Sequence, residues 1–198
     1  GGIVLTKAIG TGTATAGVKR GALTTSDIAE EIASMIQLND VASKLNANSI
    51  KVNAATDITG FGLSGHMLNV AKASGVTLEI ACNSIPLFRN TLEHLKAGFL
   101  TKAHKTNFDY VQADSNISEL RDSYQKIVTD PQTSGGLLLS VPETDLKRTL
   151  EIISPEFKHV RPIGKVINRS NRYLHFVEQL CIVKETLFEL KRHLRRCH

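Results

Sequence analysis

Tryptophan is absent from this sequence, and proline, cysteine and aromatic residues are scarce. The 198 residues include five prolines and three cysteines, and aromatic residues make up 5% of the chain. We therefore expect aliphatic side chains to dominate the packing of the core. An odd number of cysteines without short spacing argues against a disulfide framework and favours a reducing compartment, so we expect a cytoplasmic protein. The three cysteines are Cys82, Cys181 and Cys197.

Long apolar runs are also missing. No stretch approaches the roughly 18 residues that a membrane-spanning helix needs, so we expect no membrane partner. Residues 1–7 contain no charged leader followed by an apolar segment and a cleavage site, and they indicate a strand that is entered mid-chain.

Charge is distributed unevenly along the chain. The net charge is +5, and residues 179–198 carry five basic and two acidic residues, which leaves the remainder nearly neutral. We therefore divide the chain into a folded domain at 1–178 and a basic tail or extra helix at 179–198. Nucleic acid is not favoured as a partner, because no basic surface interleaved with aromatic residues is evident, although binding through the tail stays an alternative.

The hydrophobic content of 41% and charged content of 22% are ordinary for a globular protein.

Short apolar strands alternate with amphipathic helices along residues 1–178. The pattern predicts a strand at 3–7 that leads into a glycine/threonine loop at 9–13. Apolar residues at helical spacing predict a helix over 27–46 that can break near 39–40. The other expected elements, in chain order, are a strand at 50–54, a helix from 63 that ends at Gly75, a strand at 76–80, a helix at 86–97, a loop at 99–117, a helix at 120–128, a strand at 137–141, a helix at 146–153, and a closing pair of strands at 160–167 and 172–177. This order predicts a mixed α/β protein in which helices pack on a mixed sheet.

A carboxylate, hydroxyls and glycines occur together at residues 57–66, Asp-Ile-Thr-Gly-Phe-Gly-Leu-Ser-Gly-His. Asp57 stands at the expected end of a strand, and carboxylate oxygens are hard ligands that suit Mg²⁺. Thr59 offers a hydroxyl donor, and Gly60 and Gly62 allow the main chain to approach a phosphate closely. The helix that follows presents free N–H groups at its start, which also attract phosphate. The simpler alternative is that Asp57 and Thr59 only cap this helix and that the glycines only shape a turn.

A second segment of the same kind occupies residues 130–136, Asp-Pro-Gln-Thr-Ser-Gly-Gly. Thr133, Ser134 and Gly135 offer hydroxyls and approachable backbone immediately before a buried strand. Taken alone, this segment is adequately explained as a turn between a helix and a strand. Two such segments in one domain favour a pocket for a metal-bound phosphate. The histidines show no metal-binding spacing, and we expect His66 to be a polar supporting residue rather than a base.

Three blocks of this sequence resemble one known family. They are LTKAIGTG at 5–12, DITGFGLSGH at 57–66 and DPQTSGGLLL at 130–139, and their order and separation also fit. Over roughly residues 3–178, the chain is similar to the C-terminal half of the selenophosphate synthetases, or selenide, water dikinases.

The resemblance implies a fold and a reaction. The fold is the three-layer α/β/α C-terminal domain, with a mixed sheet, of the aminoimidazole ribonucleotide synthetase-like superfamily. The reaction converts ATP, selenide and water into selenophosphate, AMP and phosphate, and its product feeds selenocysteine biosynthesis. Mg²⁺ and ATP are the implied cofactors, Asp57 is the implied Mg²⁺ ligand, and a homodimer is implied for the full-length protein.

The N-terminal half of that family has no counterpart in this chain. In the family it holds the nucleophilic cysteine or selenocysteine, a nearby lysine, a glycine-rich loop and further Mg²⁺-binding aspartates. We therefore expect no catalytic residue here, and we expect the chain to be inactive until an N-terminal domain completes the site for ATP and selenide. Two alternatives stay open, namely an ATP-dependent kinase or ligase of a sister family and a catalytically silent regulatory or partner-binding domain.

Overall fold

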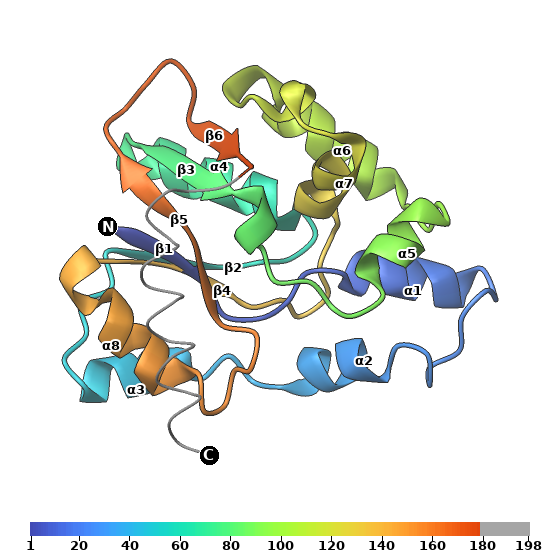
Figure 1. The fold of residues 1–198 in the computed structure, drawn as a ribbon, viewed down its shortest axis with the longest axis horizontal. Coiled ribbons are helices and arrows are strands. Elements are labelled where there is room, and N and C mark those ends of the chain that lie inside the picture. The colour runs from blue at the N-terminus through green and yellow to red at the C-terminus, as the bar shows by residue number, and fades with distance from the viewer. Residues whose placement is uncertain (179–198) are drawn as a thin grey trace.

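A six-stranded mixed sheet forms the centre of the protein. The structure, a computed structural model, describes residues 1–178 (Figure 1). Its strands are β1 (Gly2–Leu5), β2 (Ala54–Asp57), β3 (Thr77–Ala81), β4 (Leu137–Val141), β5 (Arg161–Ile167) and β6 (Leu174–Val177). Their spatial order is β2-β4-β1-β5-β3-β6, and neighbouring strands are antiparallel except for β3 and β6.

Helices cover both faces of this sheet. They are α1 (Thr11–Lys19), α2 (Ala29–Ile36), α3 (Val41–Ala47), α4 (Gly62–Ser74), α5 (Thr91–Lys96), α6 (Lys102–Val111), α7 (Asp122–Thr129) and α8 (Glu143–Ile153). Figure 1 shows α4, α6 and α7 on one side of the sheet and α3 and α8 on the other. The three-layer α/β/α arrangement of a mixed α/β fold is therefore confirmed.

Side-chain alternation along the central strand β1 supplies both layers of the core. Ile3 and Leu5 pack in one cluster of buried apolar side chains together with residues of α4 and α7. Val4 packs in a second cluster with residues of α3 and α8. Successive side chains of a strand point to opposite faces, so one continuous apolar strand can serve two layers of helices.

Several boundaries agree with the sequence pattern. The helix expected at 27–46 is divided into α2 and α3 by residues 37–40, as the pattern allowed. Gly75 has a φ of 64° and ends α4 in the left-handed conformation that favours glycine. The second strand ends at Asp57 as expected, although it begins at Ala54 rather than at residue 50.

Two expected loops are partly helical, and that part of the sequence-based prediction is wrong. The glycine/threonine segment 9–13 leads directly into α1, and the segment 99–117 contains α6. Polar side chains occupy inward positions of α6, with His104 and Asn107 buried, so apolar periodicity could not reveal this helix. A capping box at Thr101 and His104 marks its start.

The last two strands do not pair with each other, which corrects the expected closing pair. Strand β3 lies between β5 and β6, antiparallel to the first and parallel to the second. The turn between β5 and β6 is anchored on the start of β3, where the Ser170 N–H donates to the Thr77 hydroxyl at 2.9 Å. The Thr77 hydroxyl donates in turn to the Arg172 carbonyl oxygen at 2.7 Å. The start of β3 therefore holds the connection between β5 and β6 in place.

The described residues offer no candidate for a membrane-spanning segment. None of the helices within residues 1–178 has the length and hydropathy that crossing a bilayer requires. The basic tail or helix expected at 179–198 lies outside the described residues, and the division of the chain at residue 178 stays a prediction.

Candidate functional site

The two predicted phosphate-binding segments meet at one edge of the sheet. Strand β1 ends at Leu5 and β2 ends at Asp57, and β4, which lies between them, begins at Leu137. Because β4 runs antiparallel to both neighbours, its start lies at the same edge as their ends. The segment that follows β2 therefore lies beside the segment that precedes β4.

Backbone hydrogen bonds join these two segments directly. The Ile58 N–H donates to the Gly136 carbonyl oxygen at 2.9 Å. The Gln132 N–H donates to the Thr59 carbonyl oxygen at 3.0 Å. The two segments thus form one hydrogen-bonded unit. Two turns that acted independently would not need these hydrogen bonds between them.

Asp57 lies at this edge with its side chain exposed to solvent. Its backbone is in register with Leu137, which places it beside the second segment. Within residues 1–178, no group of three His, Cys, Asp or Glu side chains could hold a metal ion, so Asp57 would supply one ligand among others. Mg²⁺ commonly binds through one or two carboxylates together with phosphate oxygens and water, and a single exposed carboxylate fits that role.

The glycines of the site differ in what surrounds them. Gly60 has open space where a side chain would begin. A Cβ at Gly135 would lie 2.3 Å from the Ile58 carbonyl oxygen, and a Cβ at Gly62 would lie 3.0 Å from the Thr129 carbonyl oxygen. Gly62 also has a φ of 67°, which disfavours any side chain. Gly62 and Gly135 thus allow neighbouring segments to touch. Gly60 is exposed, and its carbonyl oxygen accepts from the Asn107 side-chain amide at 2.9 Å, so its N–H is the backbone group that a ligand could reach.

Thr59 is held by the ring of His66, a residue in the second turn of α4. Nε2 of His66 lies 3.1 Å from the Thr59 nitrogen and 3.0 Å from the Thr59 hydroxyl oxygen. Burial lowers the pKa of His66 below its ordinary value of 6.5, and the nearby Asp57 carboxylate offsets part of this shift. The neutral imidazole is therefore the favoured form at neutral pH.

The lowered pKa of His66 predicts that the protein loses stability in mild acid. The unfolded chain binds a proton at His66 at a higher pH than the folded chain does, so the free energy of unfolding should fall as pH drops below 6.5. Urea unfolding at about pH 7.5 and about pH 5 measures this loss, and His66→Gln should lose less than wild type. His159, whose pKa burial also lowers, contributes equally to both proteins. An equal loss in wild type and His66→Gln would rule out a contribution from His66.

Gln132, which the sequence pattern did not single out, caps the start of α1. Its Oε1 accepts hydrogen bonds from the N–H groups of Gly10 and Thr11 at 3.2 and 3.3 Å and from the Thr11 hydroxyl at 3.0 Å. The Thr11 hydroxyl oxygen accepts a further bond from the Thr133 N–H at 2.9 Å. These N–H groups are therefore occupied within the protein, and the exposed hydroxyls of Thr133 and Ser134 are the groups left for a ligand.

Asp130 is fully buried and serves the packing of the site. Its Oδ2 accepts from the Gly12 N–H at 3.2 Å and from the Gln132 side-chain amide at 2.7 Å. Its Oδ1 lies 3.1 Å from Nε2 of His104. A carboxylate enclosed in this way is not a ligand for an ion at the exposed edge. The Asp-Pro pair in the sequence indicates a turn but gives no sign of this burial.

Lys7 is another buried residue of the site that sequence reasoning missed. Its Nζ donates to the carbonyl oxygens of Ser34, Gln37 and Ser134 at 2.9, 2.7 and 3.1 Å. Burial lowers the pKa of Lys7. Lys7 thereby connects the end of α2, where the helix dipole favours a cation, to the second segment. Ser134, the residue it reaches there, has a φ of 47° in the left-handed region.

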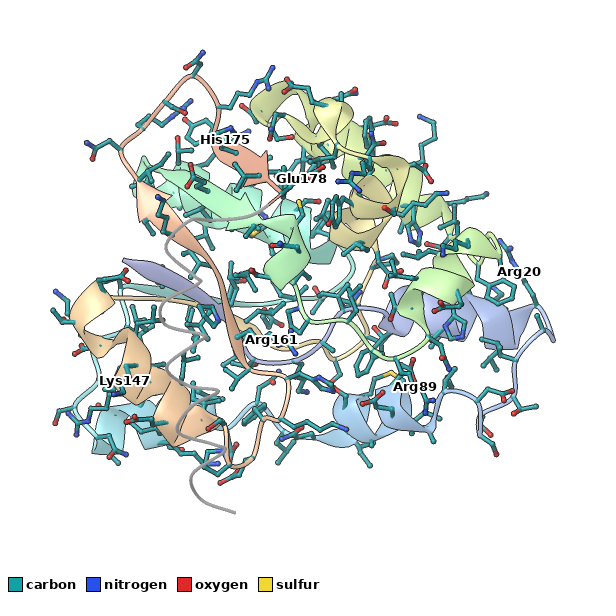
Figure 2. All side chains as sticks on the ribbon, viewed as in Figure 1. Arg20, Arg89, Lys147, Arg161, His175 and Glu178 are labelled. Carbon is teal, nitrogen blue, oxygen red and sulfur yellow. The ribbon has the colours of Figure 1, made fainter. Side chains whose placement is uncertain are left out.

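Replacing Lys7 by methionine is expected to lower the free energy of unfolding by about 2–4 kcal/mol, because three carbonyl oxygens lose a charged donor. Lys147→Met is the matched control, since Lys147 is exposed on α8 (Figure 2). The control should change stability by less than about 0.5 kcal/mol. Urea unfolding at neutral pH measures both variants. Equal effects of the two substitutions would show that the Lys7 ammonium stabilises nothing.

A pocket of about 150 Å³ opens between the end of β1, α2 and the segment before β5. Glu30 in its wall pairs with Lys158 at 3.0 Å and with His159 at 3.2 Å. Lys7 also lines this pocket, but none of the site residues predicted from the sequence does. The candidate site is therefore the exposed edge at Asp57.

This fold is found in a known family. Residues 2–176 match the family model described as AIR synthase related protein, C-terminal domain. The chain belongs to this family. The match agrees with the mixed α/β fold that the structure shows.

Selenide, water dikinases of several bacteria are similar to this chain. The chain is 43% identical over 175 residues to a selenide, water dikinase of Nitrosomonas eutropha, an alignment that covers 88% of this chain and 50% of the relative. It is 42% identical over 175 residues to a selenide, water dikinase of Bdellovibrio bacteriovorus, with the same coverage of 88% and 50%. The chain is thus homologous to the C-terminal half of selenide, water dikinase, and it spans about half the length of the curated relatives it matches.

Two solved structures of other proteins share the fold. The hydrogenase maturation protein HypE in complex with ATP superposes with a TM-score of 0.65 at 15% identity, over 89% of this chain and 47% of that one. Thiamine-monophosphate kinase from Stenotrophomonas maltophilia gives a TM-score of 0.56 at 15% identity, over 90% and 50%. At such low identity, the likeness is evidence for the fold alone.

Proposed function

We propose that this chain is the C-terminal half of a selenide, water dikinase, which makes selenophosphate from ATP, selenide and water. The observation that carries the proposal is the edge where the exposed Asp57 begins the first of two glycine-rich segments, which backbone hydrogen bonds join. Homology to selenide, water dikinases over 88% of the chain supports it.

In this proposal Asp57 is one ligand of a magnesium ion that is bound to the phosphates of ATP. Such an ion, when bound, offsets the negative charge that builds up on the phosphate oxygens. The N–H of Gly60 and the hydroxyls of Thr133 and Ser134 would donate to those oxygens, and Thr59 would add a further oxygen for the ion. Because hydrogen bonds within the protein already hold the two segments, little reorganisation is needed on binding.

A single carboxylate and two segments cannot enclose a triphosphate and its metal ions. We therefore propose that an N-terminal domain completes the site, in a cytoplasmic protein that is homodimeric at full length. The relatives provide room for such a domain, since the alignment covers 50% of their length. Cys82 does not replace the nucleophile expected there, because burial raises the pKa of its thiol to about 12 and keeps it protonated.

Mixing the two halves tests this proposal. ATP, Mg²⁺ and selenide are supplied to this chain, to a separately produced N-terminal domain and to their mixture, and phosphorus NMR detects AMP and selenophosphate. We expect selenophosphate from the mixture and none from either half. ATP turnover that is independent of selenide would favour a sister-family kinase or ligase. No turnover by the mixture or by the complete protein would favour a silent domain.

A further inference from the structure

Thr59 is fixed through each of its backbone and side-chain polar groups. Its nitrogen and hydroxyl oxygen lie 3.1 and 3.0 Å from Nε2 of His66. Its carbonyl oxygen accepts from the N–H groups of Gly62 and Gln132, both at 3.0 Å. Thr59 stands two residues after Asp57, so the contacts that fix Thr59 also restrict the directions in which the Asp57 carboxylate is presented.

The Thr59 N–H determines which tautomer His66 adopts. A backbone N–H can only donate, so Nε2 must offer its lone pair, and the proton of the neutral ring must be on Nδ1. The Thr59 hydroxyl, 3.0 Å from the same nitrogen, can donate to Nε2 as a second donor that shares this lone pair, but it cannot accept from it. In that orientation the lone pairs of the Thr59 hydroxyl oxygen stay available as acceptors. That chemistry suits a cation or the water bound to a cation better than it suits a phosphate oxygen.

Packing on the ring favours the position of His66 beside Thr59. His66 is half-buried, and the Phe61 ring meets it edge-to-face with 5.8 Å between ring centroids. Phe61 lies in turn against Tyr110 of α6, with 6.0 Å between their centroids. The Tyr110 hydroxyl donates to Oδ1 of Asn69 on α4 at 2.7 Å. Side chains from two helices thus support the ring.

We propose that His66 is the positioning residue of the metal-binding edge. As the Nδ1–H tautomer, it holds Thr59 so that the Asp57 carboxylate and the Thr59 hydroxyl oxygen are presented together as acceptors to hydrated magnesium. The magnesium ion in this inference rests on the function proposed above. The contact between His66 and Thr59 does not depend on any activity.

Two variants of this chain test the contact without any turnover assay. In His66→Gln, Oε1 is the same number of bonds from Cα as Nε2 and can accept from Thr59, whereas His66→Leu removes the acceptor and keeps an apolar volume. Nitrogen NMR of the wild type should show a protonated Nδ1 and an unprotonated Nε2. Hydrogen exchange at the Thr59 amide should be about tenfold faster or more in His66→Leu and near the wild-type rate in His66→Gln. A protonated Nε2, or equal exchange in all three proteins, would overturn the proposal.

The positioning role is tested in the complete protein, in which this chain is joined to its N-terminal half. His66→Leu should lower kcat/KM for magnesium-ATP by about 10–100-fold, and His66→Gln should restore most of it. His175→Leu, which changes an exposed histidine of β6 (Figure 2), is the control and should match wild type. Wild-type kinetics in His66→Leu would overturn the role of His66. If the wild-type complete protein shows no selenide-dependent turnover, the proposed function and the magnesium role fail, and the exchange measurement still decides the contact.

Discussion

Asp57→Asn in the complete protein is expected to lower magnesium-dependent ATP turnover by about 10²-fold, which corresponds to about 3 kcal/mol of lost stabilisation. The Asp57 side chain is exposed at the end of β2, so an amide of the same size should be accommodated without a change of fold. The amide removes the negative charge and one hard oxygen ligand, which weakens the hold on the ion and its phosphates. Steady-state release of AMP at saturating Mg²⁺ measures the effect.

The matched control for this substitution is Asp109→Asn. Asp109 is an exposed aspartate of α6 that pairs with Lys105 at 2.6 Å. The control should keep turnover within about twofold of wild type, since exposed ion pairs contribute little. Thermal unfolding of both variants separates loss of activity from loss of fold. Near-normal turnover in Asp57→Asn would remove Asp57 from the site.

Gly62→Ala is expected to lower the free energy of unfolding by about 2–4 kcal/mol, the second large effect, because backbone strain and close contact add together. The φ of Gly62 is 67°, a conformation that an alanine adopts at a cost. The new Cβ would also lie 3.0 Å from the Thr129 carbonyl oxygen, next to the second segment. Urea unfolding of the isolated chain measures the change.

Gly60→Ala is the control for this effect, two residues away in the same segment. The Cβ position of Gly60 is open, and its φ is not in the left-handed region. Its stability should therefore stay within about 0.5 kcal/mol of wild type. If both alanine variants lose the same stability, a general loss of glycine flexibility, and not the contact at Gly62, would be the cause.

The two segments at this edge of the sheet could be predicted from the sequence, because their residue types indicate a local structure and chemistry. Asp57 at a strand end is visible in a single sequence, as are the glycines that follow it and the hydroxyls before β4. Gly75 likewise indicates where α4 ends, because the left-handed conformation at a helix end favours glycine. That the two segments touch follows from the order β2-β4, which no local pattern contains.

The supporting residues could not be predicted, because their roles depend on contacts between distant parts of the chain. Gln132 meets Thr11 across 121 residues, and Lys7 meets Ser134 across 127. Sequence patterns treat polar side chains as exposed, so the burial of Lys7 and Asp130 has no signature. For the same reason the sequence pattern did not predict α6, because its inner face includes the polar His104 and lacks regular apolar spacing.

Counting bound manganese in the complete protein tests the metal role of Asp57 most directly. With Mn²⁺ in place of Mg²⁺ and ATP saturating, electron paramagnetic resonance distinguishes free from bound metal. We expect Asp57→Asn to bind one manganese ion fewer than wild type, or to bind it at least about tenfold more weakly, while Asp109→Asn matches wild type. The same number of ions bound with the same affinity in Asp57→Asn and wild type would contradict the account.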